Sequence, residues 1–548
     1  MSSETIETPV LIVGGGPVGL AMALDLGWRG IDCMLVEKTD GVIDTPKLGA
    51  VSIRTMELAR RWGIADRVRA TPYQRDWGLA MLFCTTIAGH FLARLPYPSL
   101  DEDLIPAESP EKKWRCPQLW FDPMLAACLS DYPGVALRRR TLLEGFEAQD
   151  DHVRSTVKDL ESGQTRTVVS KFLIGCDGPA STVRKGLGIT MDGKRSLDHS
   201  VAIFFRSSDL ATKHAMGPAE RYYFIDQGGW WGNISAMDGR ELWRLTVPSS
   251  EQGVEQVARD AAKWVRRALG TDDIRFEVIS ALPWRRSQLT AQHYGQDRVL
   301  IAGDSAHTMS PTGGLGMNTG LGDVDNLGWK VQASLEGWAG PKLMASYSTE
   351  RQPIGARNAA FSAHNYFALK GMPDCSAVDD DSESGIAIRK RIGDDILNAT
   401  RSEWEQLGVH LGYRYEASPI TVADGSVAPV DDQSKYVPTT RPGHRAPHAW
   451  LEGGSNGAYA SGVSTLDHFG HGFVLVRNTT QGGEVSAWVE AAAQRKLPLR
   501  VLDIARPDIQ QLYEQPLVLV RPDGHCAWRG TAGSADPGQV LDVARGAA

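Results

Sequence analysis

Three glycines near the start of the chain have the spacing of a dinucleotide-binding turn. Gly14, Gly16 and Gly19 follow the apolar run 10–13 and open a segment with helical spacing. The first glycine permits a tight turn, the second lets a pyrophosphate approach the backbone, and the third lets helix and strand pack closely. The start of this helix offers free N–H groups to a diphosphate, and Pro17 lies in the same turn.

An acidic residue closes this βαβ unit. We expect a helix over residues 20–28 and a second strand over 31–36, which ends at Glu37. A carboxylate at this point can accept hydrogen bonds from the adenosine ribose hydroxyls and would repel a 2′-phosphate. We therefore place Glu37 and its neighbour Lys38 at the nucleotide. The turn alone does not distinguish FAD from NAD.

Composition narrows the class of protein. The 548 residues carry a net charge of -8, with 58 basic and 66 acidic side chains, which disfavours nucleic acid as a partner. The start of the chain resembles no targeting peptide, and no apolar run reaches the roughly 20 residues that span a bilayer. Seven scattered cysteines favour reduced thiols over a metal site. We expect a cytoplasmic protein of two or three domains, without metal, membrane or nucleic acid.

Two more glycine-rich segments lie further along the chain. The first, residues 172–184, contains Asp177 followed by glycine. The second, residues 298–318, contains Gly303-Asp304 and then Pro-Thr-Gly-Gly over 311–314. A nicotinamide dehydrogenase would need only the first fingerprint and a catalytic pair, so these segments favour FAD.

The three segments, in this order, resemble those of the single-component FAD-dependent aromatic hydroxylases, such as p-hydroxybenzoate and phenol hydroxylases. The resemblance covers roughly residues 8–370. It implies a monooxygenase that uses FAD, O2 and NADPH or NADH to hydroxylate a phenolic or polycyclic aromatic substrate through a flavin C4a-hydroperoxide. The chain has no second G-x-G-x-x-G, so the reductant would bind transiently, and NADH versus NADPH stays open.

The resemblance also implies roles for single residues. Asp304 matches the aspartate on the ribityl chain, and Gln118 a glutamine on the same side. The backbone of 314–318 would meet the flavin pyrimidine edge at a helix start, where N–H groups stabilise negative charge. Arg54 matches an arginine near the FAD phosphates, and Asp177 a motif associated with both FAD and NAD(P)H. The cofactor residues implied in this way are Arg54, Gln118, Asp177, Gly303, Asp304, Pro311, Gly314, Gly316, Met317 and Asn318.

Lys47 departs from the family pattern. Relatives commonly have arginine in this segment, Thr-Pro-Lys-Leu over residues 45–48. A lysine keeps the positive charge but loses the bidentate phosphate contact.

A short strand motif indicates where a substrate would lie. The Arg-Tyr-Tyr of Arg221–Tyr223 resembles a strand of p-hydroxybenzoate hydroxylases, which implies that Arg221 is close to the flavin and Tyr223 faces the substrate. Pro311 matches a proline whose carbonyl faces the substrate ring. Trp230 and Trp231 could wall an aromatic pocket, although the sheet core is favoured for at least one of them. For His307 a structural role is favoured, and no general base is identified.

The last part of the chain resembles the thioredoxin-like C-terminal domain of the phenol and polyketide hydroxylase branches. Only Cys526 lies there, which excludes disulfide exchange; a homodimer formed through this domain stays open. We predict an α/β (α+β) protein whose Rossmann-like FAD-binding domain carries an inserted antiparallel sheet. The predicted parts are a FAD-binding domain over 1–200 and 281–370, a substrate sheet over 201–280, a helical linker over 371–410, and a thioredoxin-like domain over 411–548.

Two other functions are alternatives to hydroxylation. A flavin-dependent halogenase shares the fold but usually carries a W-x-W-x-I-P segment, which this sequence lacks. A flavin-binding protein without activity is disfavoured by the intact Gly-Asp and Pro-Thr-Gly segments.

Overall fold

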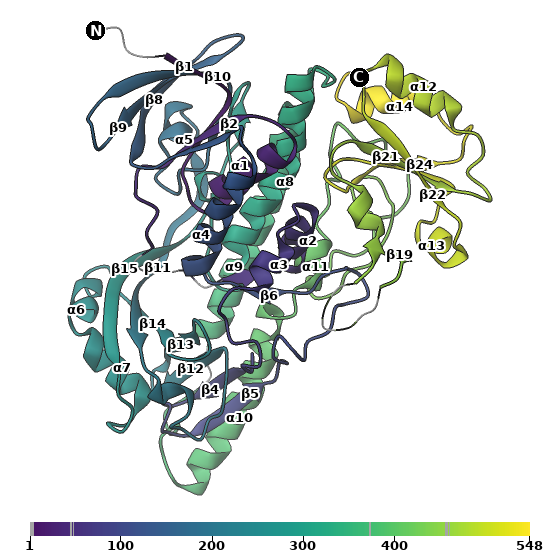
Figure 1. The fold of residues 1–548 in the computed structure, drawn as a ribbon. Coiled ribbons are helices and arrows are strands. Elements are labelled where there is room, and N and C mark those ends of the chain that lie inside the picture. Colours follow the sequence, from purple (N-terminus) through teal and green to yellow (C-terminus); the bar gives the residue numbers. More distant parts are fainter. Residues whose placement is uncertain are drawn as a thin grey trace.

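The structure is a computed structural model that describes residues 5–43, 47, 49–371, 374–454, 457, 459 and 461–548. Two large sheets lie one above the other in Figure 1, and the C-terminal elements lie to their right. The long helices α8 (Leu315–Glu336) and α9 (Ala345–Lys370) run between these parts. Three bodies therefore meet along two helices.

The first sheet has a parallel centre. The run of buried apolar residues at 10–13 ends its central strand, as expected where helices cover both faces. Helix α1 (Pro17–Trp28) follows that strand and connects it to the next one. The parallel order is β7 (Val135–Arg138), β2 (Cys33–Val36), β1 (Thr5–Val13), β10 (Thr165–Gly175) and β17 (Val299–Ile301). This is the predicted Rossmann-like arrangement.

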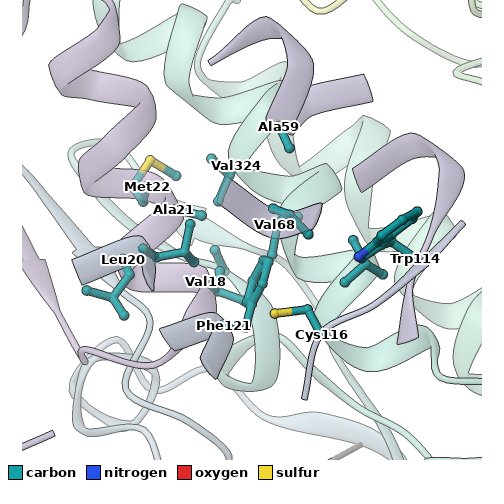
Figure 2. Close-up of a cluster of buried hydrophobic side chains, with 14 of the residues drawn as sticks. Val18, Leu20, Ala21, Met22, Ala59, Val68, Trp114, Cys116, Phe121 and Val324 are labelled. Carbon is teal, nitrogen blue, oxygen red and sulfur yellow. The ribbon is translucent and has the colours of Figure 1, made fainter. Parts of the chain in front are cut away.

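Helix α1 is held by an apolar cluster. Val18 and Leu20 of α1 pack near Phe121 of α4 (Gln118–Cys128) and Val324 of α8 (Figure 2). Burying an aliphatic or aromatic side chain of this size stabilises a fold by about 1.5–3 kcal/mol. The cluster fixes the start of α1, and with it the glycine turn, against the sheet.

The second sheet is larger than the predicted segment 201–280. Its last two strands on one side, β4 (Met81–Cys84) and the edge strand β5 (Phe91–Leu95), come from much earlier in the chain, and β15 (Glu277–Ala291) extends beyond the predicted end. In spatial order the strands are β18 (His307–Thr308), β15 (Glu277–Ala291), β11 (Met191–Arg206), β14 (Leu242–Ser249), β13 (Gly229–Ala236), β12 (Arg221–Asp226), β4 (Met81–Cys84) and β5 (Phe91–Leu95). No local pattern shows that β4 pairs with β12 more than a hundred residues away, so the sequence reading missed it.

The predicted linker 371–410 contains a long helix that is part of the core. Helix α10 (Glu383–Thr400) packs on the edge strand β5. Its buried side chains Ile392 and Ile396 join Phe83 and Leu95 in one apolar cluster. The segment therefore covers the sheet as well as connecting two domains.

The C-terminal part contains a four-stranded mixed sheet. β21 (Phe473–Asn478) pairs in parallel with β22 (Leu499–Ile504) and antiparallel with β23 (Leu517–Val520), which pairs with β24 (Cys526–Gly530). Helices α12 (Ser486–Gln494) and α14 (Pro537–Ala544) pack together on it. Cys526 is buried with a free thiol.

Two further features concern the whole described chain. No helix among the described residues combines the length and the apolar character that crossing a bilayer requires. In the same residues, no three His, Cys, Asp or Glu side chains form a group that could hold a metal ion.

Buried ion pairs join the C-terminal domain to the long helices. Arg521 donates to Glu350 of α9 at 2.9 Å and also pairs with Asp523. Lys330 of α8 donates to the same Glu350 at 2.6 Å. All four side chains are inaccessible to solvent. Burial opposes ionisation of Glu350, but Arg521 and Lys330 outweigh it and lower the pKa of this carboxyl to about 2.

Removing the carboxylate of Glu350 should destabilise the contact between the C-terminal domain and the long helices. We expect Glu350→Gln to lower the free energy of unfolding by about 3–5 kcal/mol, because two buried cations lose their counter-charge. Urea denaturation at pH 7 measures the change. The exposed Glu490→Gln in α12 is the control, with an expected change within about 0.5 kcal/mol. The buried network is not important for stability if both variants unfold at the same urea concentration.

Candidate functional site

The glycine turn has the backbone that its spacing predicts. Gly14 has φ +105°, and a Cβ there would lie 2.3 Å from the carbonyl oxygen of Cys176. A Cβ on Gly19 would lie 1.9 Å from the carbonyl oxygen of Gly14. At Gly16, by contrast, an added Cβ meets nothing within 4 Å. The fold therefore requires glycine at positions 14 and 19, whereas Gly16 leaves open space in front of α1.

The start of α1 is free to bind an anion. Gly16 is its N-cap and makes no side-chain cap, and Pro17 occupies the first turn. The N–H groups of this turn and the helix dipole therefore point toward the open space. The structure thus places Gly14, Gly16, Pro17 and Gly19 together at one cradle.

Glu37 directly follows β2 and lies beside the cradle. Its carboxylate accepts hydrogen bonds from the backbone N–H groups of Gly15 at 2.6 Å and Thr39 at 2.7 Å. Next to it lies a cavity of about 200 Å³. Lys38 follows on the exposed side. The cavity is lined by Gly15, Gly16, Leu20, Glu37, Thr39, Gly41, Val42, Ile43, Gln118, Asp122, Pro123, Ala126, Leu137 and Arg139.

Gln118 belongs to the same cavity. Its amide donates to Asp122 at 2.9 Å and accepts a long bond from the backbone N–H of Lys47 at 3.4 Å. Burial raises the pKa of the Asp122 carboxyl to about 7. The ammonium of Lys47 lies 3.4 Å from the carboxylate of Asp304. The neighbours of Lys47, residues 44–46 and 48, lie outside the described part of the chain.

Asp177 positions the Gly-Asp segment. Its carboxylate accepts from the backbone N–H of Thr182 at 2.6 Å and from the hydroxyl of Ser305 at 3.0 Å. Gly303, with φ +61°, packs against Val18 of α1. Asp304 therefore stands at the cradle with its side chain partly exposed and paired only with Lys47 among the described residues.

His307 has a buried structural position. Its Nε2 lies 2.7 Å from Asp323 of α8, which also accepts from Arg351 at 2.8 Å and from the backbone N–H of Gly303 at 3.0 Å. Although burial opposes it, His307 and Arg351 lower the pKa of Asp323. These contacts fasten the Gly-Asp segment to α8 and α9.

The Pro-Thr-Gly-Gly turn leads into α8. Gly313 and Gly314 have φ +86° and +67°, and Gly314 caps α8 without a side-chain hydrogen bond. The Pro311 carbonyl accepts from the N–H of Gly314 at 3.0 Å. The Asn318 amide donates to the carbonyl of Ala50 at 2.8 Å, so this side chain holds the turn in place. The backbone of Gly314, Gly316, Met317 and Asn318 forms this helix start, where a flavin ring is expected.

Arg54 lies elsewhere than expected. Its guanidinium donates to Asp325 at 2.7 Å, to Glu57 at 2.8 Å, and to the carbonyl of Asp523 at 2.7 Å. Arg54 and Glu57 stand three residues apart on α2 (Ile53–Arg61), and this spacing brings them together. The structure thus joins Arg54 to the domain junction and gives its predicted phosphate contact no support.

The second sheet has two different faces. Register places Arg221, Tyr223 and Trp230 on one face, which we call the inner face. Tyr366 of α9 packs edge-on against Trp230 there, with ring centroids 6.3 Å apart. The opposite, outer face carries apolar side chains such as Phe224 under helix α7 (Ala261–Leu269).

Trp231 does not belong to the inner face. A bulge between Phe224 and Ile225 turns it outward, where it stacks on Phe224 and lies beside Trp264 of α7. Arg267 of α7 covers its ring at 4.1 Å. Trp231 therefore lies on the outer face, away from Tyr223 and Trp230, where it takes the core role expected for at least one of the two tryptophans.

Glu403 links the inner face to the turn before α8. Its carboxylate accepts from Arg221 at 3.2 Å and from the backbone N–H of Gly313 at 3.2 Å. Arg221 also donates to the hydroxyl of Tyr223 at 3.0 Å. The Glu403 carboxylate thus connects Arg221 and Tyr223 to the turn that follows Pro311, and no sequence motif predicted this role for Glu403.

The residues present fit FAD. A dinucleotide needs a helix start with free N–H groups, space at the turn and an acid after the second strand; the start of α1, Gly16 and Glu37 supply them. The isoalloxazine needs a second helix start, which α8 supplies without a side-chain cap. Three glycine-rich segments far apart in the sequence converge there.

Comparison with known proteins agrees with this geometry. Residues 7–362 match a family described as FAD binding domain, and residues 439–547 match one described as aromatic-ring hydroxylase, C-terminal. A putative polyketide hydroxylase of Streptomyces halstedii is 32% identical over 96% of this chain and 94% of its own length. The 2,4-dichlorophenol 6-monooxygenase of Cupriavidus pinatubonensis is 30% identical over 97% and 94%.

A solved structure gives the same picture for the whole chain. The rebeccamycin biosynthetic enzyme RebC, with bound 7-carboxy-K252c, is 38% identical, has a TM-score of 0.91, and both chains are covered completely. The glycine cradle, the inserted sheet and the C-terminal domain are therefore one shared architecture. The chain belongs to the family of FAD-dependent aromatic-ring hydroxylases, whose members are monooxygenases.

Proposed function

We propose that this monooxygenase hydroxylates an extended, polycyclic phenolic compound that lies on the inner face of the second sheet. Bound FAD supplies the electron transfer from NAD(P)H and the activation of O2. The protein's own residues hold the cofactor, orient the aromatic ring and keep water away from it. Of the two earlier alternatives, halogenation has no support from the relatives, which are named as monooxygenases and hydroxylases.

The main support for the proposal is the width of the inner face beside the Pro-Thr-Gly-Gly turn at residues 311–314, which we call the flavin turn. Inward side chains extend from Arg221 on β12 to Arg286 on β15, which is about 19 Å for four interstrand spacings of ~4.8 Å. Aromatic rings line this face at Tyr223, Trp230 and Tyr366. Such a surface suits several fused rings better than a single phenol.

The inner face and the flavin turn are fixed relative to each other. Arg221 and Gly313 share the carboxylate of Glu403, and the guanidinium of Arg221 also lies over the ring of Trp404 at 4.9 Å. A ring held on the inner face is thereby oriented toward the start of α8. This orientation is the protein's main contribution to a transfer that the cofactor performs.

Turnover with labelled oxygen tests the proposal. We expect the FAD-loaded protein to oxidise NADPH or NADH faster with three-ring and four-ring phenols and to insert one atom from 18O2 into the product, detected by mass spectrometry. The kcat/KM should exceed that for phenol and 2,4-dichlorophenol by about tenfold or more, since added rings bury more apolar surface. Preference for the monocyclic phenols would contradict the substrate class, and a protein that binds no FAD would contradict the cofactor site.

Gly16→Val should remove FAD binding without harming the fold. Gly16 has φ -74°, which any residue adopts, and its added Cβ meets nothing in the protein alone. The side chain would fill the space that the pyrophosphate needs, so we expect at least a hundredfold weaker FAD binding, measured by flavin fluorescence.

A second open glycine supplies the matched control. Gly145 on β8 (Thr141–Ala148) also leaves room for a Cβ but lies on a hairpin away from the cradle. Gly145→Val should keep FAD binding, and both variants should melt near the wild-type temperature. Normal FAD affinity in Gly16→Val would refute the assignment of the turn.

A further inference from the structure

A buried arginine on the inner face has no counter-charge. Arg244 of β14 lies opposite Ser235 of β13, which lies opposite Arg221, so all three side chains leave the sheet on the same side. Arg244 is 8% exposed. No hydrogen bond or ion pair joins its guanidinium to any residue that the structure describes, and its buried Nε has no acceptor. A buried charge without a partner is costly, so its partner is to be sought outside the protein.

The surroundings make this charge less favourable still. Burial, together with the nearby cations Arg221 and Arg286, lowers the pKa of Arg244 to about 10. Arg221 uses Glu403, and Arg286 donates only to hydroxyls, at 2.8 Å to Ser310. Two further acids lie near these groups: Asp198 pairs with Lys370 at 3.0 Å, and the buried Glu220, next to Arg221, pairs with Arg115. Near this face there are thus five positive charges and three negative ones: Arg115, Arg221, Arg244, Arg286 and Lys370 against Glu220, Glu403 and Asp198.

In the part of the chain that the structure describes, most of the unpartnered polar atoms on and beside this face are N–H groups, which can only donate; the hydroxyls of Tyr97 and Ser362 are unpartnered as well. Among the described residues, no acceptor reaches the Nε atoms of Arg221, Arg244 and Arg286, or the indole N–H groups of three tryptophans. Buried polar groups in native proteins are nearly always satisfied, so a group of unsatisfied donors calls for a ligand rich in acceptors. The tryptophans are Trp230, Trp284 and Trp404.

We infer that the aromatic substrate carries a carboxylate and that Arg244 receives it on the inner face. A guanidinium with both Nε and Nη unoccupied presents the flat fork that matches two carboxylate oxygens. A phenolate or carbonyl offers a single oxygen and would leave part of this fork unused. The inference rests on the proposed function and narrows its substrate class to aromatic carboxylic acids with a ring hydroxyl.

Three matched ligands test the inference on the FAD-loaded protein. The probes are 1-hydroxy-2-naphthoate, its carboxamide and 1-naphthol, with binding read from the change in flavin absorbance. We expect the carboxylate to bind at least tenfold tighter than the amide and the naphthol. Arg244→Gln should reduce this preference to less than twofold, and Arg244→Lys should keep part of it, because a point charge remains.

The variants are compared with an exposed arginine of the same sheet. Arg285 of β15 is exposed and stands one residue from Arg286, on the other side of the strand, so Arg285→Gln should bind all three probes as the wild type does. Because nothing neutralises Arg244 in the protein alone, Arg244→Gln should melt at the wild-type temperature or above it. Its FAD content and FAD affinity should be unchanged.

Several results would overturn the inference. One is equal binding of the carboxylate and the amide to the wild type, including binding of neither. Another is a full carboxylate preference in Arg244→Gln. Loss of FAD in Arg244→Gln would assign the arginine to the flavin instead. Absence of FAD from the wild type would defeat the proposed function itself, and this spectrum is recorded before any probe is added.

Discussion

Helix α8 carries a row of polar side chains, most of them buried, whose partners come from several parts of the chain. Asn318 binds the backbone before α2, Asp323 binds His307 and Arg351, Asp325 binds Arg54, and Lys330 binds Glu350. A buried polar group without a partner costs about 1–3 kcal/mol, more when charged. The helix can therefore be buried only when all of these segments are in place. These contacts therefore also fix the first turn of α8, where the flavin ring is expected.

The two faces of the second sheet have different roles: one packs in the apolar core, and the other carries the residues proposed to meet the substrate. On β12, Tyr222 and Phe224 enter the apolar core, while Arg221 and Tyr223 point to the inner face. The inner face is apolar where Tyr223 and Ile225 pack with Phe83, but it also carries the buried charged side chains Arg244 and Arg286. Its unsatisfied donors mark the surface that the protein's own residues leave for a ligand.

The sequence predicted best what depends on local backbone. The turn at Gly14 and the start of α8 at Gly314 require a positive φ, which favours glycine, so the positions of these glycines in the sequence predict the two turns. It predicted poorly what depends on pairing between distant segments. The bulge that turns Trp231 outward and the helix contact that takes up Arg54 are set by tertiary packing. Arg244 lies in no motif, and its significance comes only from the partners it lacks.

The ion pair between Glu57 and Arg445 spans 388 residues of chain. Glu57 also binds Arg54 of the same helix α2, so its two cationic partners are synthesised at very different times. At ~5–20 residues per second, the ribosome needs roughly 20–80 seconds to travel from one to the other. During that interval Glu57 has only half of its cations, and Glu350 still lacks Arg521. The flavin-binding half of the protein is thus made early but reaches its final electrostatic balance only when the last domain leaves the ribosome.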